Sequence, residues 1–132
     1  MIILSEYFMG RDKQYPDELT DTLHKNAEQT VASVNVLLGF FGEHRKVNSG
    51  WRPAAINAST PGAAAKSKHM TCQACDLDDP EGDLDEWCLA HPDILTKIGL
   101  WQEHPASTKG WCHVQTVQYR SWRPGKPRWF YP

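Results

Sequence analysis

The sequence predicts an α+β protein, on three observations. A long amphipathic helical pattern comes first, short strand-like segments follow it, and the stretch between them is rich in Ala, Ser, Gly and Pro. A chain of 132 residues supports one hydrophobic core, so we expect a single domain spanning residues 1–132. The expected architecture is a long N-terminal helix packed on a short antiparallel sheet.

The helical pattern follows a turn at Tyr15-Pro16-Asp17 and ends near Gly39 and Gly42. Its apolar side chains recur at three- and four-residue steps, which places them on one helix face. They are Leu19, Leu23, Ala27, Val31, Val34, Leu38 and Phe41. We expect this helix to pack against the core and to carry no chemistry.

The later segments read as strands, loops and one further helix. Strands are expected at 46–48, 74–79, 98–103 and 111–119, a surface loop with at most one helical turn at 54–68, and a helix at 87–98 interrupted at Pro92. The acidic run DDPEGDLDE is expected to be a solvated turn. The aromatic and basic tail, 119–132, is expected to pack on the domain, although its rings could instead stack on sugars.

The bulk composition excludes several classes of protein. The formal net charge is −2, so no overall field favours nucleic acid or an anionic membrane. The longest apolar run is far below the ~20 residues that span a bilayer. The N-terminus MIILSEYF lacks the basic start of a secretory signal. We therefore expect a soluble monomer, made in the cytoplasm, that acts elsewhere only if something delivers it.

Four cysteines in such a chain suggest thiols or metal ligands rather than disulfides. His69, Cys72 and Cys75 have spacings that a structural zinc site uses, with Cys88 or Cys112 as a fourth ligand. Such a site would be closed and non-catalytic. The alternative is that the cysteines are small packed thiols.

A second cluster has a different chemistry. Side chains alternate along a strand, so His113 shares a face with Trp111 and Gln115. Asp76 on the earlier strand and His69 from the loop before it can converge with His113. Two imidazoles and one carboxylate form a three-ligand zinc site with its fourth position open, which is the arrangement of a catalytic zinc.

The order of several short motifs resembles one known family. The motifs are Ser49-Gly50-Trp51-Arg52 with Asn57 after it, Ser67-Lys68-His69, Asp76 seven residues after that histidine, and Trp111-Cys112-His113-Val114. Together they resemble the zinc D-Ala-D-Ala carboxypeptidases and peptidoglycan L,D-endopeptidases, which include bacteriophage endolysins. With the opening LSEYF and the long helix, the resemblance covers nearly the whole chain.

The resemblance implies a function and a set of roles. His69, Asp76 and His113 would hold one Zn²⁺ per chain in a loop-lined cleft, and Arg52 would bind or polarise a substrate carbonyl or carboxylate. Ser67 and His104 would contact the substrate. The reaction would be hydrolysis of amide bonds in peptidoglycan stem peptides by a zinc-activated water. The protein would reach the cell wall after release by a partner membrane protein, or in a virion.

One departure from the family concerns the general base. Many relatives carry an acidic residue three positions before the last zinc histidine, and Gly110 stands there in this chain. Glu103 is the expected substitute, with His104 beside it as the alternative. The same departure supports a rival hypothesis, a non-catalytic zinc-binding structural or virion module of the same fold.

Overall fold

The computed structural model describes residues 1–132, and its longest element is helix α3, Asp21–Phe41. The Thr20 hydroxyl accepts the Leu23 N–H at its start, and Gly42 ends it with a left-handed φ of 93°. Its buried side chains follow the predicted helical spacing: Ala27, Thr30, Val31, Val34, Leu37 and Leu38. The amphipathic helix is confirmed.

The remaining elements are short. The helices are α1 (Leu4–Phe8), α2 (Arg11–Gln14), α4 (Ala54–Ser59), α5 (Asp83–Ala90) and α6 (Pro92–Ile98), with 3-10 turns η1 (Pro16–Glu18) and η2 (Pro105–Ser107). The strands are β1 (Val47–Ser49), β2 (Ala74–Asp79), β3 (Trp101–Glu103), β4 (Gly110–Gln115) and β5 (Trp129–Phe130). No helix is long and apolar enough to cross a membrane.

The five strands form one sheet in the order β1-β2-β4-β3-β5. The first three pairings in that order are antiparallel, as expected, whereas β5 pairs with β3 in parallel. The β2/β4 pairing sets Asp76 directly opposite His113. This register brings two candidate site residues together because paired residues in a ladder point to the same face.

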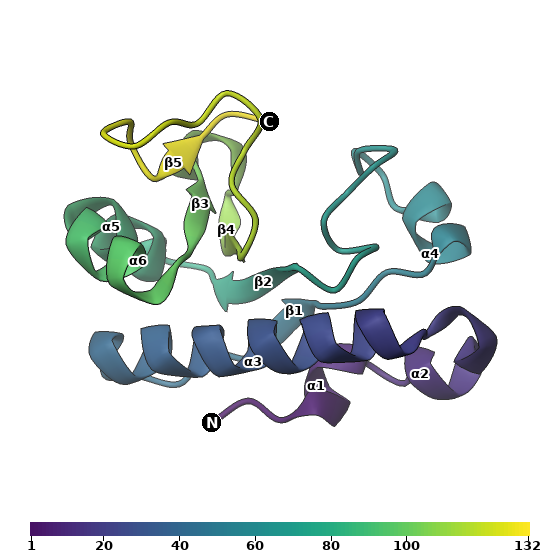
Figure 1. Ribbon diagram of the computed structural model, residues 1–132. Coiled ribbons are helices and arrows are strands. Elements are labelled where there is room, and N and C mark those ends of the chain that lie inside the picture. Colours follow the sequence, from purple (N-terminus) through teal and green to yellow (C-terminus); the bar gives the residue numbers. More distant parts are fainter.

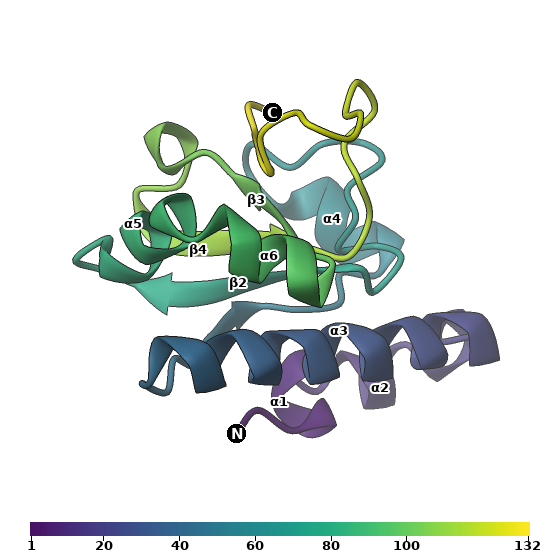
Figure 2. The same ribbon diagram turned by 60° about the vertical axis from the view of Figure 1, so that its left-hand side comes forward.

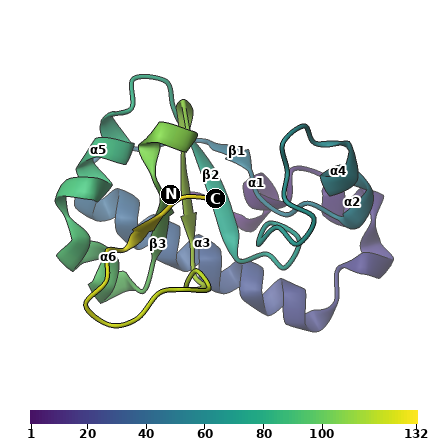
Figure 3. The ribbon, with the colours of Figure 1, turned by 90° about the horizontal axis from the view of Figure 1, so that it is seen from above.

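The two faces of the sheet have different roles. Cys75 and Leu77 of β2 and Cys112 and Val114 of β4 join a cluster of buried apolar side chains that also includes side chains of α3, α5 and α6. Helix α3 runs along the sheet, with α5 and α6 at one side and α4 at the other (Figure 1, Figure 3). Because side chains alternate along a strand, the residues between these core positions, Asp76 and His113, point to the opposite face.

The C-terminal tail packs against the edge of the sheet near β3 (Figure 2). The Gln102 N–H donates to the Arg128 carbonyl at 2.8 Å. The Arg128 guanidinium lies 3.9 Å from the ring centre of Trp101, and its Nε donates to the Leu100 carbonyl at 3.0 Å. The Trp122 ring meets Trp101 edge-on at 5.2 Å. These contacts match a tail whose rings serve mainly to hold it on the domain.

One prediction about the middle of the chain needs correction. The acidic run is not a solvated turn, because Asp79 and Asp85 are buried. The Asp79 carboxylate accepts the N–H groups of Leu84 and Asp85 at 3.1 and 2.9 Å, which satisfies the first turn of α5. The predicted interruption of the helical segment 87–98 at Pro92 is confirmed, because α5 ends at Ala90 and Pro92 is the first residue of α6.

Candidate metal centre

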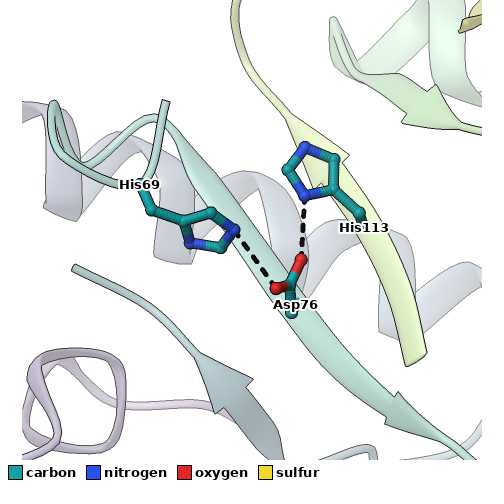
Figure 4. A group of neighbouring side chains, drawn as sticks. All are labelled: His69, Asp76 and His113. Carbon is teal, nitrogen blue, oxygen red and sulfur yellow. Dashed lines mark hydrogen bonds and ion pairs between the residues drawn. The ribbon is translucent and has the colours of Figure 1, made fainter. Parts of the chain in front are cut away.

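The site is built from three segments that meet on the face of the sheet opposite the core. His69 comes from the loop before β2, Asp76 from β2 and His113 from β4, and their side chains point toward one another (Figure 4). One ligand atom from each lies within 4.8 Å of the others. The convergence predicted from strand alternation is present.

The His69 ring is held in one orientation. Its Nδ1 lies 2.8 Å from the Gly50 carbonyl oxygen, which can only accept, so Nδ1 carries the proton. The Nε2 atom therefore presents a lone pair, and it faces Asp76 Oδ2 at 3.2 Å. That nitrogen is buried and has no hydrogen-bond partner. Two acceptors face each other at this point.

The SGWR segment supports this arrangement. A Cβ on Gly50 would collide with the Tyr7 carbonyl, so only glycine fits there. Trp51 is buried in the core, and the Arg52 N–H donates to the His69 carbonyl at 3.1 Å. The segment thus fixes the His69 loop through its backbone while it directs the Arg52 side chain to the site.

The His113 ring is oriented from the other side. The Gln115 amide nitrogen donates to the Val117 carbonyl at 2.7 Å, which leaves its Oε1 facing His113 Nε2 at 2.9 Å. Nε2 is therefore the protonated nitrogen, and Nδ1 faces Asp76 Oδ1 at 2.8 Å. Sequence reasoning placed Gln115 on this face but gave it no role. The sequence feature that could have indicated this role is the position of Gln115 two residues after His113, on the same face of the strand.

Four lone-pair-bearing atoms therefore converge on one space without a donor among them. They are His69 Nε2, His113 Nδ1 and the two Asp76 oxygens. A cation or extra protons must supply the missing positive charge. Burial opposes protonation and lowers the pKa of His69. Burial acts in the same direction on His113, but Asp76, Gln115 and Glu103 together favour its protonated form and raise its pKa. Two imidazole nitrogens and a carboxylate are a donor set that suits Zn²⁺.

Two charged side chains flank this cluster. An Arg52 guanidinium nitrogen lies 3.9 Å from Asp76 Oδ2, and another lies 3.5 Å from Asn57 Oδ1. On the other side, Glu103 Oε2 at the end of β3 lies 3.9 Å from His113 Nδ1. Burial raises the pKa of Glu103, and Asp76 adds to this, although His113 opposes it. A carboxylate and a guanidinium thus flank the cluster, one near His113 and the other near Asp76.

The other two residues predicted to contact the substrate, Ser67 and His104, lie at different distances from the cluster. Ser67 is next to the cluster, and its hydroxyl oxygen accepts the His69 N–H at 3.2 Å. His104 has its Nδ1 occupied by the Ala106 N–H at 3.1 Å, and its ring stacks on Tyr131 at 4.7 Å. The structure brings Ser67 to the site and leaves His104 with the tail.

The cysteine-ligated zinc alternative is wrong. His69, Asp76 and His113 form the one group of three or more His, Cys, Asp or Glu side chains whose ligand atoms converge. Strand alternation puts Cys75 on the core face, opposite Asp76. Burial also raises the pKa of Cys72 to about 12, which disfavours the thiolate that binds metal. All four cysteines are buried free thiols.

Fold and site together define a class. An α+β domain that presents two imidazoles and a carboxylate, flanked by a partly buried glutamate and an arginine, has the parts of a metal-dependent hydrolase. The family model described as Peptidase M15 matches residues 12–114, which include every residue of the cluster and both flanking groups. The chain therefore belongs to the M15 peptidases, a metal-dependent family, as the resemblance predicted. Neither the curated proteins nor the solved structures compared with it include a match.

Proposed function

We propose that this protein is a zinc-dependent peptidase that hydrolyses amide bonds in peptidoglycan stem peptides, as a D-Ala-D-Ala carboxypeptidase or an endolysin-type endopeptidase. The observation that carries the proposal is the convergence of His69 Nε2, His113 Nδ1 and the Asp76 carboxylate without a donor among them, in a chain of the M15 family. We propose these three side chains as the ligands of one zinc ion. When bound, zinc supplies Lewis acidity and lowers the pKa of a water ligand to about 7.

Glu103 is the proposed general base. It stands beside the cluster at the end of β3, and burial raises its pKa toward the range in which a carboxylate accepts a proton and returns it. Glu103 takes a proton from the attacking water as oxygen adds to the carbonyl carbon. It then delivers that proton to the amide nitrogen as the C–N bond breaks, so that a carboxylate and an amine leave.

Arg52 is the proposed electrophilic and substrate-binding group. Its guanidinium is largely buried, and its Nε has no hydrogen-bond partner. A charged donor held in this way stabilises a substrate carbonyl or carboxylate strongly. Ser67 is proposed to donate its hydroxyl hydrogen to the substrate backbone, since its oxygen already accepts the His69 N–H. His104 is proposed to reach only the outer part of the substrate.

Metal content and wall hydrolysis test the proposal together. We expect wild type to hold one zinc per chain and to release amines from purified cell walls in an EDTA-sensitive reaction. His113→Ala should lose both properties. Glu103→Gln should keep zinc while its rate falls by about 10²–10⁴. His24→Ala, which removes a half-exposed histidine of α3, is the matched control and should behave as wild type. Zinc retained by His113→Ala would contradict the ligand assignment.

The second candidate function is a zinc-binding structural or virion module without catalysis. Gly110 favours it, because this exposed residue with a φ of 99° offers no side chain where many relatives have a base. That function predicts zinc in both wild type and Glu103→Gln and intact walls with both. In either case we propose a monomer that reaches the wall after release from the cell or as part of a virion.

A further inference from the structure

The tail adds an aromatic pair to the site from outside the region that the family model matches. The match ends at residue 114, and β5, Trp129–Phe130, lies beyond it. Strand β5 extends the sheet at β3, where Phe130 is the ladder partner of Glu103. The proposed base and a phenyl ring therefore lie side by side.

Phe130 also contacts the proposed metal ligand on this side. Its ring centre lies 6.1 Å from that of His113, with the two planes at 84°. The Tyr119 ring lies 5.4 Å from Phe130 at 34°, and the Tyr119 hydroxyl donates to the Pro127 carbonyl at 2.9 Å. Both rings are only partly buried, so they keep a surface that can meet a ligand.

This aromatic pair is fixed in place. The Phe130 carbonyl accepts the His104 N–H at 2.8 Å, and Arg128, two residues earlier, stacks on Trp101. A rigid apolar surface binds a side chain at a lower entropic cost than a mobile one. The two rings therefore form a fixed apolar surface, which we call the wall.

The two sides of the cluster differ in polarity. Arg52 lies at the Asp76 Oδ2 side, and Phe130 lies at the His113 and Glu103 side. Glu103 delivers the proton to the leaving amine in the proposed reaction, so the residue that carries this amine lies nearest to Phe130. The polar end of the substrate is then on the Arg52 side.

We infer that Phe130 and Tyr119 form an apolar wall that contacts the side chain of the residue whose amine leaves, and that this wall favours an apolar side chain over none at that position. The inference rests on the proposed function and deepens it by assigning a specificity site. One methyl or methylene group in an apolar pocket changes kcat/KM by about 10–200-fold. A wall of two partly exposed rings belongs at the lower end of that range.

A pair of peptides tests this inference. The bond cut in the wall assay is identified by mass spectrometry, and two synthetic peptides are made with alanine or glycine supplying the leaving amine. We expect the zinc-loaded wild type to favour alanine by about tenfold in kcat/KM. Phe130→Ala should bring the ratio close to one, mainly by lowering kcat/KM on the alanine peptide, and it should keep its zinc. Phe130→Leu should keep part of the preference.

Phe40→Ala is the matched control, since Phe40 is an exposed phenylalanine on α3. It should retain the full preference for alanine. An unchanged ratio in Phe130→Ala, with hydrolysis intact, would overturn the wall and leave the peptidase proposal standing. A fall in rate on both peptides with zinc lost would assign Phe130 a structural role instead.

A binding measurement separates this inference from a failure of the proposed function. Calorimetry of both peptides with zinc-loaded Glu103→Gln, with and without Phe130→Ala, needs no hydrolysis. Tighter binding of the alanine peptide that disappears with Phe130→Ala supports the wall even if wild type cuts neither peptide. Equal binding of the two peptides by both proteins overturns it.

Discussion

Two aspartates that lie toward opposite faces of the same sheet have opposite surroundings. Asp85 of α5, 1% exposed, accepts the Thr108 hydroxyl at 2.7 Å and the Gln102 amide at 2.9 Å. Asp76 of β2 faces an imidazole nitrogen with each oxygen, at 2.8 and 3.2 Å. Each Asp85 oxygen thus has a donor in the protein, whereas the partners of Asp76 present lone pairs.

Their acidities follow these surroundings. Burial raises the pKa of Asp85, and its neutral donors reduce that effect without reversing it. Burial also acts to raise the pKa of Asp76, but the two adjacent imidazoles of His113 and His69, which can donate to it when protonated, hold its pKa below the usual range. A buried carboxylate completed by hydroxyl and amide donors stabilises the fold. One that meets imidazole lone pairs needs a cation or added protons.

The largest expected effect comes from Asp76→Asn. The new amide can donate to His69 Nε2, so it supplies from the protein the hydrogen that the cluster lacks. It also removes one of the three proposed ligands. We expect zinc affinity to fall by more than the roughly 10–100-fold typical of an outer-shell change. The metal-free variant should melt no lower than metal-free wild type.

Asp85→Asn is the matched control for that variant, because it makes the same change on the other face. It should leave zinc affinity unaltered. Equal zinc binding by Asp76→Asn and wild type, measured by chelator competition, would show that the cluster is complete without metal.

Gln115→Leu should have the next largest effect. The variant removes the acceptor that keeps the proton on His113 Nε2, so Nδ1 no longer presents its lone pair reliably. We expect zinc affinity to fall by about 10–100-fold, with folding retained. Gln118→Leu, which changes an exposed glutamine nearby, should not alter affinity. If both variants bind zinc as wild type does, Gln115 does not orient the ring.

Thr108→Val tests how much the hydroxyl donor of Asp85 contributes to stability. The substitution keeps the side-chain shape and removes the hydroxyl that donates to Asp85. Hydrogen bonds to charged groups contribute about 1.5–3 kcal/mol, so the free energy of unfolding in urea should fall by about that amount. Zinc content should stay at the wild-type level. Thr96→Val, at an exposed threonine, is expected to change stability by less than about 0.5 kcal/mol.

The smallest effect is a pH dependence. The pKa of Asp85 is raised in the folded state, so the stability that this group contributes is fully present below the unfolded pKa, about 3.9. It is lost as pH rises through the folded pKa. Asparagine does not titrate, so the stability of wild type relative to Asp85→Asn should decline as the pH rises above about 4. Urea unfolding of both proteins in EDTA measures this difference in stability at each pH. A difference that stays constant or increases with pH would contradict the raised pKa of Asp85.

The sequence predicted those parts of the site that depend only on residues close together in the chain. Strand alternation in ACDLDD and in WCHVQ places Asp76 and His113 on the face opposite the core, and the loop position of His69 allows it to reach them. The same reasoning mistook Asp85 for a solvated residue. Its burial depends on Thr108 and Gln102, more than fifteen positions away, and no local pattern reports such partners.

By itself, the sequence determined the α3 helix, most strand positions and the identity of the converging side chains, because hydrophobic period and strand alternation act over a few residues. Only the tertiary structure decided which nitrogen of each histidine faces Asp76. That choice depends on the Gly50 carbonyl and the Gln115 amide as placed by packing. It likewise decided that the tail returns as a parallel strand beside Glu103, since pairing between distant segments depends on the whole fold.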